Sequence, residues 1–314
     1  MREKPREHGY YDYPVVKRPV WTWEVPVYFW LGGIGGGAFI TSSLAQRFGS
    51  DEDARSLADG FYVAAAALLP CTPLLIMDLG RPDRFHHMLR VFKPVSPMNL
   101  GAWTLATFTP VALARAAALA ADRGLLPKVA AILTDLVPRG LTELGGSVLG
   151  ITLAGYTGVL LAATNIPLWA KSKLLGGLFT ASALASGSAA VSLMAALRSA
   201  GDGPLHRLSK IESAASLAEL ALVAGYIGQS GRTARPLTAQ RRALPFWLGA
   251  VGVGAVMPLL LHRVAAKRSG VRLRRLTTLA SLGAIGGSLA LRWTVFEAGK
   301  ESANDQAASF ELSS

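Results

Sequence analysis

The chain has 314 residues, of which 51% are hydrophobic and 17% are charged. Soluble proteins carry about 25% charged residues, so the composition argues against a soluble surface of this size, and the mean hydropathy of +0.35 agrees. The single cysteine excludes an internal disulfide, a protein-held iron–sulfur cluster and a c-type haem, because each needs more thiols. The formal net charge of +12 then indicates basic loops beside a membrane rather than a nucleic-acid surface.

Eight stretches of the chain are long and apolar enough to cross a bilayer, which takes about 20 predominantly apolar residues. They far exceed the strands of a membrane barrel, and they are rich in the small residues that let membrane helices approach closely. We therefore predict an all-α fold, a polytopic bundle of about eight transmembrane helices. The predicted spans are 25–47, 57–79, 100–121, 141–163, 174–197, 211–230, 243–264 and 274–297.

These spans divide the chain into a polar N-terminal segment, 1–24, a transmembrane domain, 25–297, and a polar C-terminal tail, 298–314. We expect the N-terminal segment to lie at the membrane surface or at a partner interface. An even number of spans places both termini on one side of the membrane, here named side A. Lys and Arg are divided almost equally between side A and the opposite side B, so the positive-inside rule leaves the orientation open.

Ionisable side chains within membrane spans are energetically unfavourable, so each is a functional candidate. The direction of the chain places one group near side A, with aromatic and amide side chains at helix ends: Glu24, Asp78, Arg292, Tyr28, Tyr156, Trp103 and Asn165. A second group falls toward side B or mid-span: Arg115, Glu143, Glu212, His262 and Glu219. Structural roles are the alternatives, namely an interfacial aromatic belt and a salt bridge of Asp78 with Arg81 at a helix end.

The histidines argue against a haem-bearing subunit. Membrane cytochromes b hold haem between histidines of facing helices, whereas only His262 of the five histidines falls in a predicted span. No zinc-ligand spacing, P-loop or nucleophile elbow occurs in the sequence either. The constellation that remains suits binding of a lipid-soluble redox molecule with proton movement, and it equally suits a small-solute transporter.

Several stretches carry a resemblance to a known family. The segment 21-WTWEVPVYFWLGGIGGGAF-39 is an aromatic–Glu–Pro start followed by a Gly-rich span, and 76-IMDLGRPDRFHHMLRVFKPVSPMNLGAW-103 contains DLGRP and SPM. Two further stretches are 155-GYTGVLLAATNIPLWAKSKLLGGLFTASALASG-187 and 286-GGSLALRWTVFEAG-299. In this order, they resemble the NrfD/PsrC family of integral membrane subunits, named for nitrite reductase and polysulfide reductase complexes.

The resemblance implies a role. Such subunits lack redox centres, bind menaquinone or ubiquinone as substrate, and dock a four-cluster, ferredoxin-like iron–sulfur protein that usually connects to a molybdopterin catalytic subunit. It therefore implies a quinone-interacting membrane anchor of a multi-subunit respiratory oxidoreductase, a multi-pass protein of the bacterial inner membrane. The alternatives are a secondary transporter or ion-translocating subunit without quinone chemistry, and a purely structural anchor.

The resemblance also places the quinone near the first span and the DLGRP motif. We expect Asp78 or Glu24 to exchange protons with the quinone and Tyr156 to hydrogen-bond a carbonyl, because quinone chemistry needs donors and a titratable group. Arg81 and Arg292 would hold the carboxylates ionised or form a docking surface. Further side-A candidates for quinone binding are Trp103 and Asn165.

A second hypothesis is a proton path from side B. Glu212, Glu143 and Arg115 would give access from that side, and Glu219 would lie midway toward the quinone. The structural alternative is that Glu143 and Glu212 mark helix starts, where carboxylates interact favourably with the helix dipole.

Overall fold

The computed structural model describes residues 19–126, 138–239 and 241–304. Within these ranges the chain is helical, and eight helices or helix series are long and apolar enough to cross a membrane. This confirms the predicted all-α membrane fold. In chain order the spans are α1 (Glu24–Phe48), the series α2 (Asp51–Leu57), α3 (Gly60–Leu68) and α4 (Cys71–Met77), α5 (Pro97–Asp122), α7 (Arg139–Ala162), α9 (Leu175–Leu197), α10 (Asp202–Ser230), the π-helical η4 (Pro245–Val256) with α12 (Met257–Ala265), and α13 (Gly270–Ser302).

The second span is broken into three pieces where the sequence suggested one run. A capping box starts it, because the Ser50 hydroxyl accepts from the Asp53 N–H while the Asp53 carboxylate accepts from the Ser50 N–H. The first break lies at Asp59, whose buried carboxylate pairs with Arg123 and Arg198. The second lies at Pro70, which lacks the backbone N–H that a continuous helix needs.

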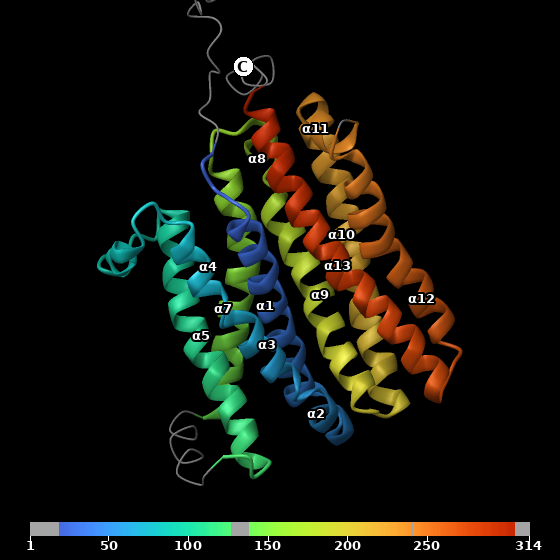
Figure 1. The fold of residues 1–314 in the computed structure, drawn as a ribbon. Helices are drawn as coiled ribbons and strands as arrows, with labels where there is room; N and C mark the ends of the chain where they lie inside the picture. The colour runs from blue at the N-terminus through green and yellow to red at the C-terminus, as the bar shows by residue number, and fades with distance from the viewer. Residues whose placement is uncertain (1–18, 127–137, 240, 305–314) are drawn as a thin grey trace, which may run out of the picture.

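Helices α1 and α9 form the centre of the bundle. Helices α3, α5 and α7 lie on one side of them, and α10, α12 and α13 lie on the other (Figure 1). The close approach of α1 depends on its glycines: a Cβ on Gly37 would lie 2.1 Å from the Ala183 carbonyl oxygen of α9, and one on Gly36 would lie 2.6 Å from the Gly150 carbonyl oxygen of α7. Small residues therefore set this packing, as the sequence predicted.

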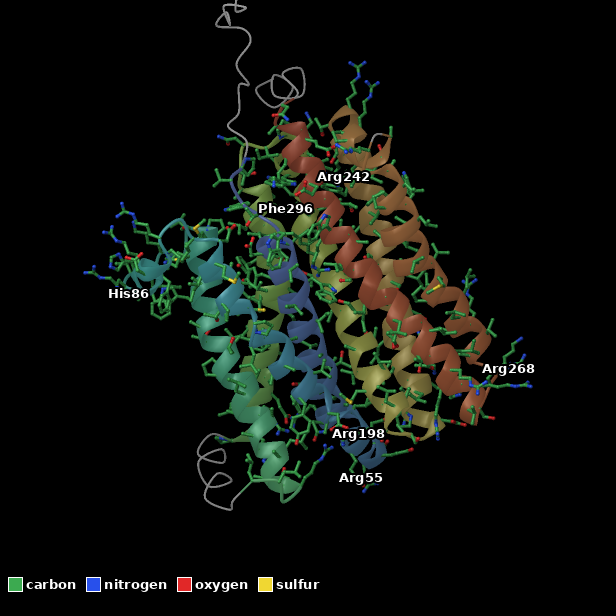
Figure 2. All side chains as sticks on the ribbon, viewed as in Figure 1. Arg55, His86, Arg198, Arg242, Arg268 and Phe296 are labelled. Carbon is green, nitrogen blue, oxygen red and sulfur yellow. The ribbon has the colours of Figure 1, made fainter. Side chains whose placement is uncertain are left out.

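Short elements cluster at the two ends of the bundle. Side A carries the 3₁₀ helix η2 (Pro82–Leu89), α8 (Pro167–Ala170), η3 (Gly231–Ala234), α11 (Arg235–Thr238) and the end of α13 (Figure 1). Charged side chains gather at both ends, with Arg242 on side A and Arg55, Arg198 and Arg268 on side B (Figure 2). Residues 127–137, 1–18 and 305–314 lie outside the described residues.

Candidate functional site

A cavity of about 240 Å³ lies on side A among α1, α4, η2, α5 and α7. Its walls are mostly apolar, and a few polar side chains reach it, a pattern typical of small-molecule sites. The polar groups are Asp78, Tyr28, Tyr156 and Thr72. The apolar walls include Phe29, Leu75, Ile76, Phe85, Met88, Leu89, Met98, Leu105 and Leu160. The cavity thus joins the first span to the DLGRP segment, where the quinone was expected.

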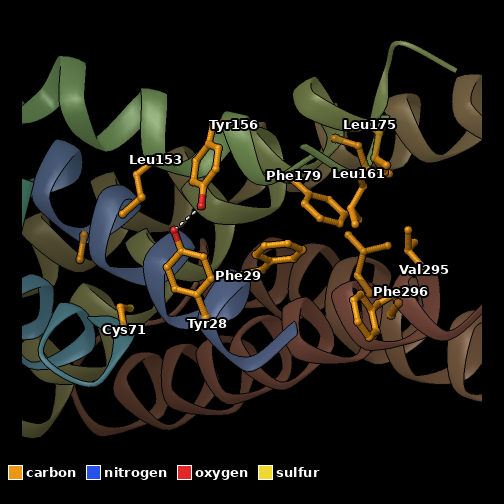
Figure 3. Close-up of a cluster of buried hydrophobic side chains, with 14 of the residues drawn as sticks. Tyr28, Phe29, Cys71, Leu153, Tyr156, Leu161, Leu175, Phe179, Val295 and Phe296 are labelled. Carbon is orange, nitrogen blue, oxygen red and sulfur yellow. Dashed lines mark hydrogen bonds between the residues drawn. The ribbon is translucent and has the colours of Figure 1, made fainter. Parts of the chain in front are cut away.

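Two tyrosines meet at the cavity wall. The hydroxyl oxygens of Tyr28 on α1 and Tyr156 on α7 lie 2.5 Å apart, and both side chains are buried (Figure 3). Space for Tyr156 comes from Gly101 on α5, where a Cβ would lie 2.1 Å from the tyrosine ring. The sequence motifs assigned Tyr156 to a quinone carbonyl but gave Tyr28 no role. The available signal was its spacing, since Tyr28 lies one helical turn after Glu24 on the same face.

The two predicted acids are brought together by Thr22. Its N–H and its hydroxyl lie 3.0 Å and 3.1 Å from Asp78 Oδ1, and its hydroxyl also contacts the Glu24 carboxylate. Asp78 directly follows α4 and lines the cavity, whereas Glu24, at the start of α1, is absent from the lining. Among the described residues Asp78 forms no ion pair with Arg81, and its carboxylate instead accepts from the Thr22 N–H and hydroxyl.

Three predicted quinone-binding residues lie outside the cavity wall. Arg81 is exposed at the start of η2, and Asn165 is exposed between α7 and α8. Trp103 on α5 is half-buried and packs edge-on against Phe92, with ring centroids 6.0 Å apart. The structure therefore does not bring these three side chains to Asp78 and the tyrosines.

Arg292 is fully buried on α13, in the neighbouring part of the bundle. Its guanidinium donates to Ser182 Oγ at 3.1 Å, to Ser288 Oγ at 2.5 Å and to the Phe179 carbonyl at 3.2 Å. Glu219 of α10 lies beside the same Ser182 and interacts electrostatically with Arg292. Arg292 thus belongs to a polar cluster between α9, α10 and α13 rather than to the cavity.

Aromatic rings connect this cluster to the cavity. Phe29 lines the cavity, and its ring centroid lies 6.3 Å from that of Phe179. The guanidinium carbon of Arg292 lies 5.3 Å from the centroid of the same Phe179 ring. The neighbouring rings of Phe29 and Phe179 (Figure 3) therefore connect the cavity wall to the buried arginine.

The side-B candidates fall into two separate groups. Arg115 on α5 pairs with Glu143 on α7 at 2.6 Å, and its guanidinium lies 4.4 Å from the centroid of the Phe61 ring. Glu212 on α10 instead hydrogen-bonds Ser192 of α9 and lies 3.1 Å from His262 Nε2 of α12. Because α5 and α7 lie across the bundle from α10 and α12, the four predicted path residues do not form one series.

Glu212 also differs from the helix-start alternative. Helix α10 begins at Asp202, so Glu212 lies well inside it and is buried, far from the N-terminal turn. Glu219 lies seven residues farther along the same helix, on the same face. That alternative is therefore wrong for Glu212. The two buried carboxylates of α10 have separate partners, Ser192 and His262 for Glu212 and Arg292 for Glu219. No group of three metal-ligating side chains occurs in the part of the chain that the structure describes.

Comparison with known proteins agrees with this architecture. A family described as "Polysulphide reductase, NrfD" matches residues 14–302. The C subunit of polysulfide reductase from Wolinella succinogenes is 30% identical over 304 residues, which cover 90% of this chain and 94% of that protein. Protein NrfD of Escherichia coli K12 is 27% identical over 308 residues, covering 90% of this chain and 95% of that protein. The chain therefore belongs to the NrfD family of polytopic membrane proteins, as its motifs predicted.

Proposed function

We propose that this chain is the quinone- or quinol-reactive membrane anchor of a multi-subunit respiratory oxidoreductase in a bacterial inner membrane. It exchanges electrons with an iron–sulfur partner of the four-cluster ferredoxin type, which connects it to a molybdopterin catalytic subunit. One observation carries the proposal: an apolar cavity on side A in which a carboxylate and a hydrogen-bonded tyrosine pair are the main polar groups. The names of the relatives support a reductase role, since one of them is a subunit of polysulfide reductase.

The cavity residues have distinct roles in this proposal. Interconversion of a quinone and a quinol moves two electrons and two protons, so a proton must be exchanged at each carbonyl oxygen. Asp78 exchanges a proton at one oxygen, and Thr22 orients its carboxylate through two hydrogen bonds. The hydroxyls of Tyr28 and Tyr156 hydrogen-bond the other oxygen, while the apolar walls exclude water and accept the ring and its lipid tail.

Glu24 supplies the link to water. It sits at the start of α1, contacts Thr22 and lies outside the cavity lining. A proton leaving Asp78 therefore has a second carboxylate next to it, on the way to side A. Electrons reach the cavity from a partner docked on side A, because the single cysteine of this protein, Cys71, is buried and cannot hold a cluster by itself.

The test replaces the cavity carboxylate in the intact complex. We expect Asp78→Asn to lower quinone-dependent turnover by about 10²–10⁴-fold, while electron transfer to a water-soluble dye at the catalytic subunit is unchanged. Asp83→Asn is the matched control, because Asp83 is an exposed acid five residues farther along the sequence. A purified complex that contains no quinone and is insensitive to quinone-site inhibitors would instead favour the transporter or a purely structural anchor.

We propose further that the buried acids of α10 move protons from side B toward the quinone. Glu212 with His262 lies toward side B, and Glu219 with Arg292 lies closer to the cavity. We expect Glu219→Gln to abolish proton movement across proteoliposomes while quinone turnover continues. Unchanged proton movement at unchanged turnover would exclude this path.

A further inference from the structure

The segment between α4 and α5 forms an arm, here defined as residues 81–96. It contains η2 and ends at Ser96, the cap of α5. The arm leaves the bundle sideways, at the level where α4 ends and α5 begins, and does not cross over the end of the bundle (Figure 1). Its outer part therefore lies beside the protein, where the membrane surface surrounds the spans.

The exposed side chains of the arm are strongly cationic. Arg81, Arg84, Arg90 and Lys93 stand against a single acid, Asp83, and all five are exposed. His86 and His87 add two further exposed nitrogen-bearing side chains. Figure 2 shows the nitrogen-tipped side chains around His86 directed away from the bundle. This charge is complementary to an anionic surface.

The same arm exposes apolar side chains. The exposed fractions are 43% for Phe85, 57% for Phe92 and 94% for Val95. A short segment that combines exposed apolar groups with arginines and lysine is typical of elements that lie in the membrane interface, with the cations at the headgroups. A soluble partner protein docked on the end of the bundle would not cover these apolar side chains, because they lie at the edge of the bundle, in contact with lipid.

The arm is held in one conformation by Asn99 of α5. The Asn99 amide donates to the Met88 carbonyl at 2.9 Å and to the Val91 carbonyl at 3.0 Å, and its oxygen accepts from the Lys93 N–H at 2.6 Å. The inner side chains Phe85, Met88 and Leu89 meanwhile form a wall of the side-A cavity. The cationic outer face is therefore presented by a built element that is fixed to the bundle.

We propose that the arm binds the headgroups of anionic phospholipids at the side-A surface of the membrane. Arg84, Arg90 and Lys93 pair with lipid phosphates, while Phe92 and Val95 reach the acyl boundary. The sign of the charge and the sideways placement favour lipid over a protein partner. This inference does not depend on quinone chemistry, so it can fail or succeed independently of the proposed function.

The test uses the full-length protein in lipid nanodiscs with a fluorescent dye attached through Val95→Cys. Cys71 is buried, so an otherwise unchanged protein provides the labelling control. Brominated phosphatidylglycerol and brominated phosphatidylcholine, at equal mole fraction, serve as quenchers. We expect stronger quenching by phosphatidylglycerol, and we expect each of Arg84→Gln, Arg90→Gln and Lys93→Gln to reduce that preference about fivefold. A triple arm variant combines these three substitutions. Its matched control replaces three exposed arginines of side B, as Arg263→Gln, Arg268→Gln and Arg272→Gln.

The outcomes separate the possible occupants of the arm. Loss of the phosphatidylglycerol preference in the triple arm variant, with the side-B control unaffected, supports the proposal. Equal quenching by both lipids, or a preference that survives the triple substitution, overturns it. A dye that neither lipid quenches, and that partner subunits shield when added, also overturns it and identifies the arm as a protein-docking surface. Each measurement is independent of quinone turnover, so failure of the proposed function leaves it interpretable.

Discussion

Arg292 Nη2 lies 2.6 Å from the position that a Cβ atom on Gly33 would occupy. The guanidinium thus fills a space on α1 that exists because that residue is glycine. There it donates hydrogen bonds to serines of α9 and α13 and to a backbone carbonyl, which compensate for its removal from water. The Gly-rich part of α1 therefore serves both close helix packing and the accommodation of a buried cation.

Gly33→Ala should destabilise the protein by about 1–3 kcal/mol, because the added methyl group forces Arg292 out of its hydrogen-bonded position. Gly286→Ala is the matched control, since nothing lies within 4 Å of the Cβ position there and it also lies in a helix. Thermal unfolding in detergent measures both. Equal melting temperatures for the two variants would contradict the steric argument.

The tyrosine pair should behave as one unit in quinone binding. Tyr28→Phe and Tyr156→Phe each remove one hydroxyl of the same hydrogen bond, so each should raise the KM for quinone by about 5–10-fold. The double variant should be less impaired than the product of the two effects. Tyr226→Phe is the control, because that hydroxyl donates to the Leu168 carbonyl and lies outside the cavity lining. A KM shift in the control as large as in the pair would argue for general destabilisation.

The Arg115–Glu143 pair should be structural. Arg115→Leu leaves a carboxylate that is 12% exposed without its partner, so the variant should lose about 3–5 kcal/mol of stability. The double variant with Glu143→Leu should regain most of that loss, because no unpaired charge remains. Unfolding measurements on Arg115→Leu, Glu143→Leu and the double variant form a double-mutant cycle. A double variant less stable than Arg115→Leu would contradict a purely structural role of the pair.

The separation of the two side-B groups predicts different effects on proton movement. Glu212→Gln should lower proton uptake into proteoliposomes, because Glu212 shares a face of α10 with Glu219 and contacts His262. Glu143→Gln should leave proton uptake per quinone turned over unchanged, since Glu143 lies across the bundle beside Arg115. If Glu143→Gln lowered proton uptake and Glu212→Gln did not, the proton path would instead run along α5 and α7.

Hydropathy and motif spacing were sufficient for the architecture. Runs of apolar residues predict spans because an unpaired backbone in lipid is highly unfavourable, and the observed helices α5, α7 and α9 begin and end within a few residues of the predicted runs. Asp78 and Tyr156, which the family motifs near span ends predicted for quinone chemistry, both line the side-A cavity, and their role there stays a prediction. These features are local along the sequence.

Tertiary contacts determined what sequence reasoning missed. Thr22 joins Glu24 to Asp78 across 56 residues, and Tyr28 meets Tyr156 across 128. Neither contact has a periodic or compositional signal in one sequence. The division of Glu143 from Glu212 likewise depends on which helices are neighbours, which a linear order of spans does not specify.

The broken second span has a mechanical consequence for the cavity. Ion pairs hold its side-B pieces to neighbouring helices, because Asp53 pairs with Arg207 and Asp59 pairs with Arg123 and Arg198. Its last piece, α4, is only seven residues long and ends beside Asp78. The ion pairs therefore anchor the side-B end of this span, whereas the short side-A piece beside the cavity is joined to that end across the Pro70 break.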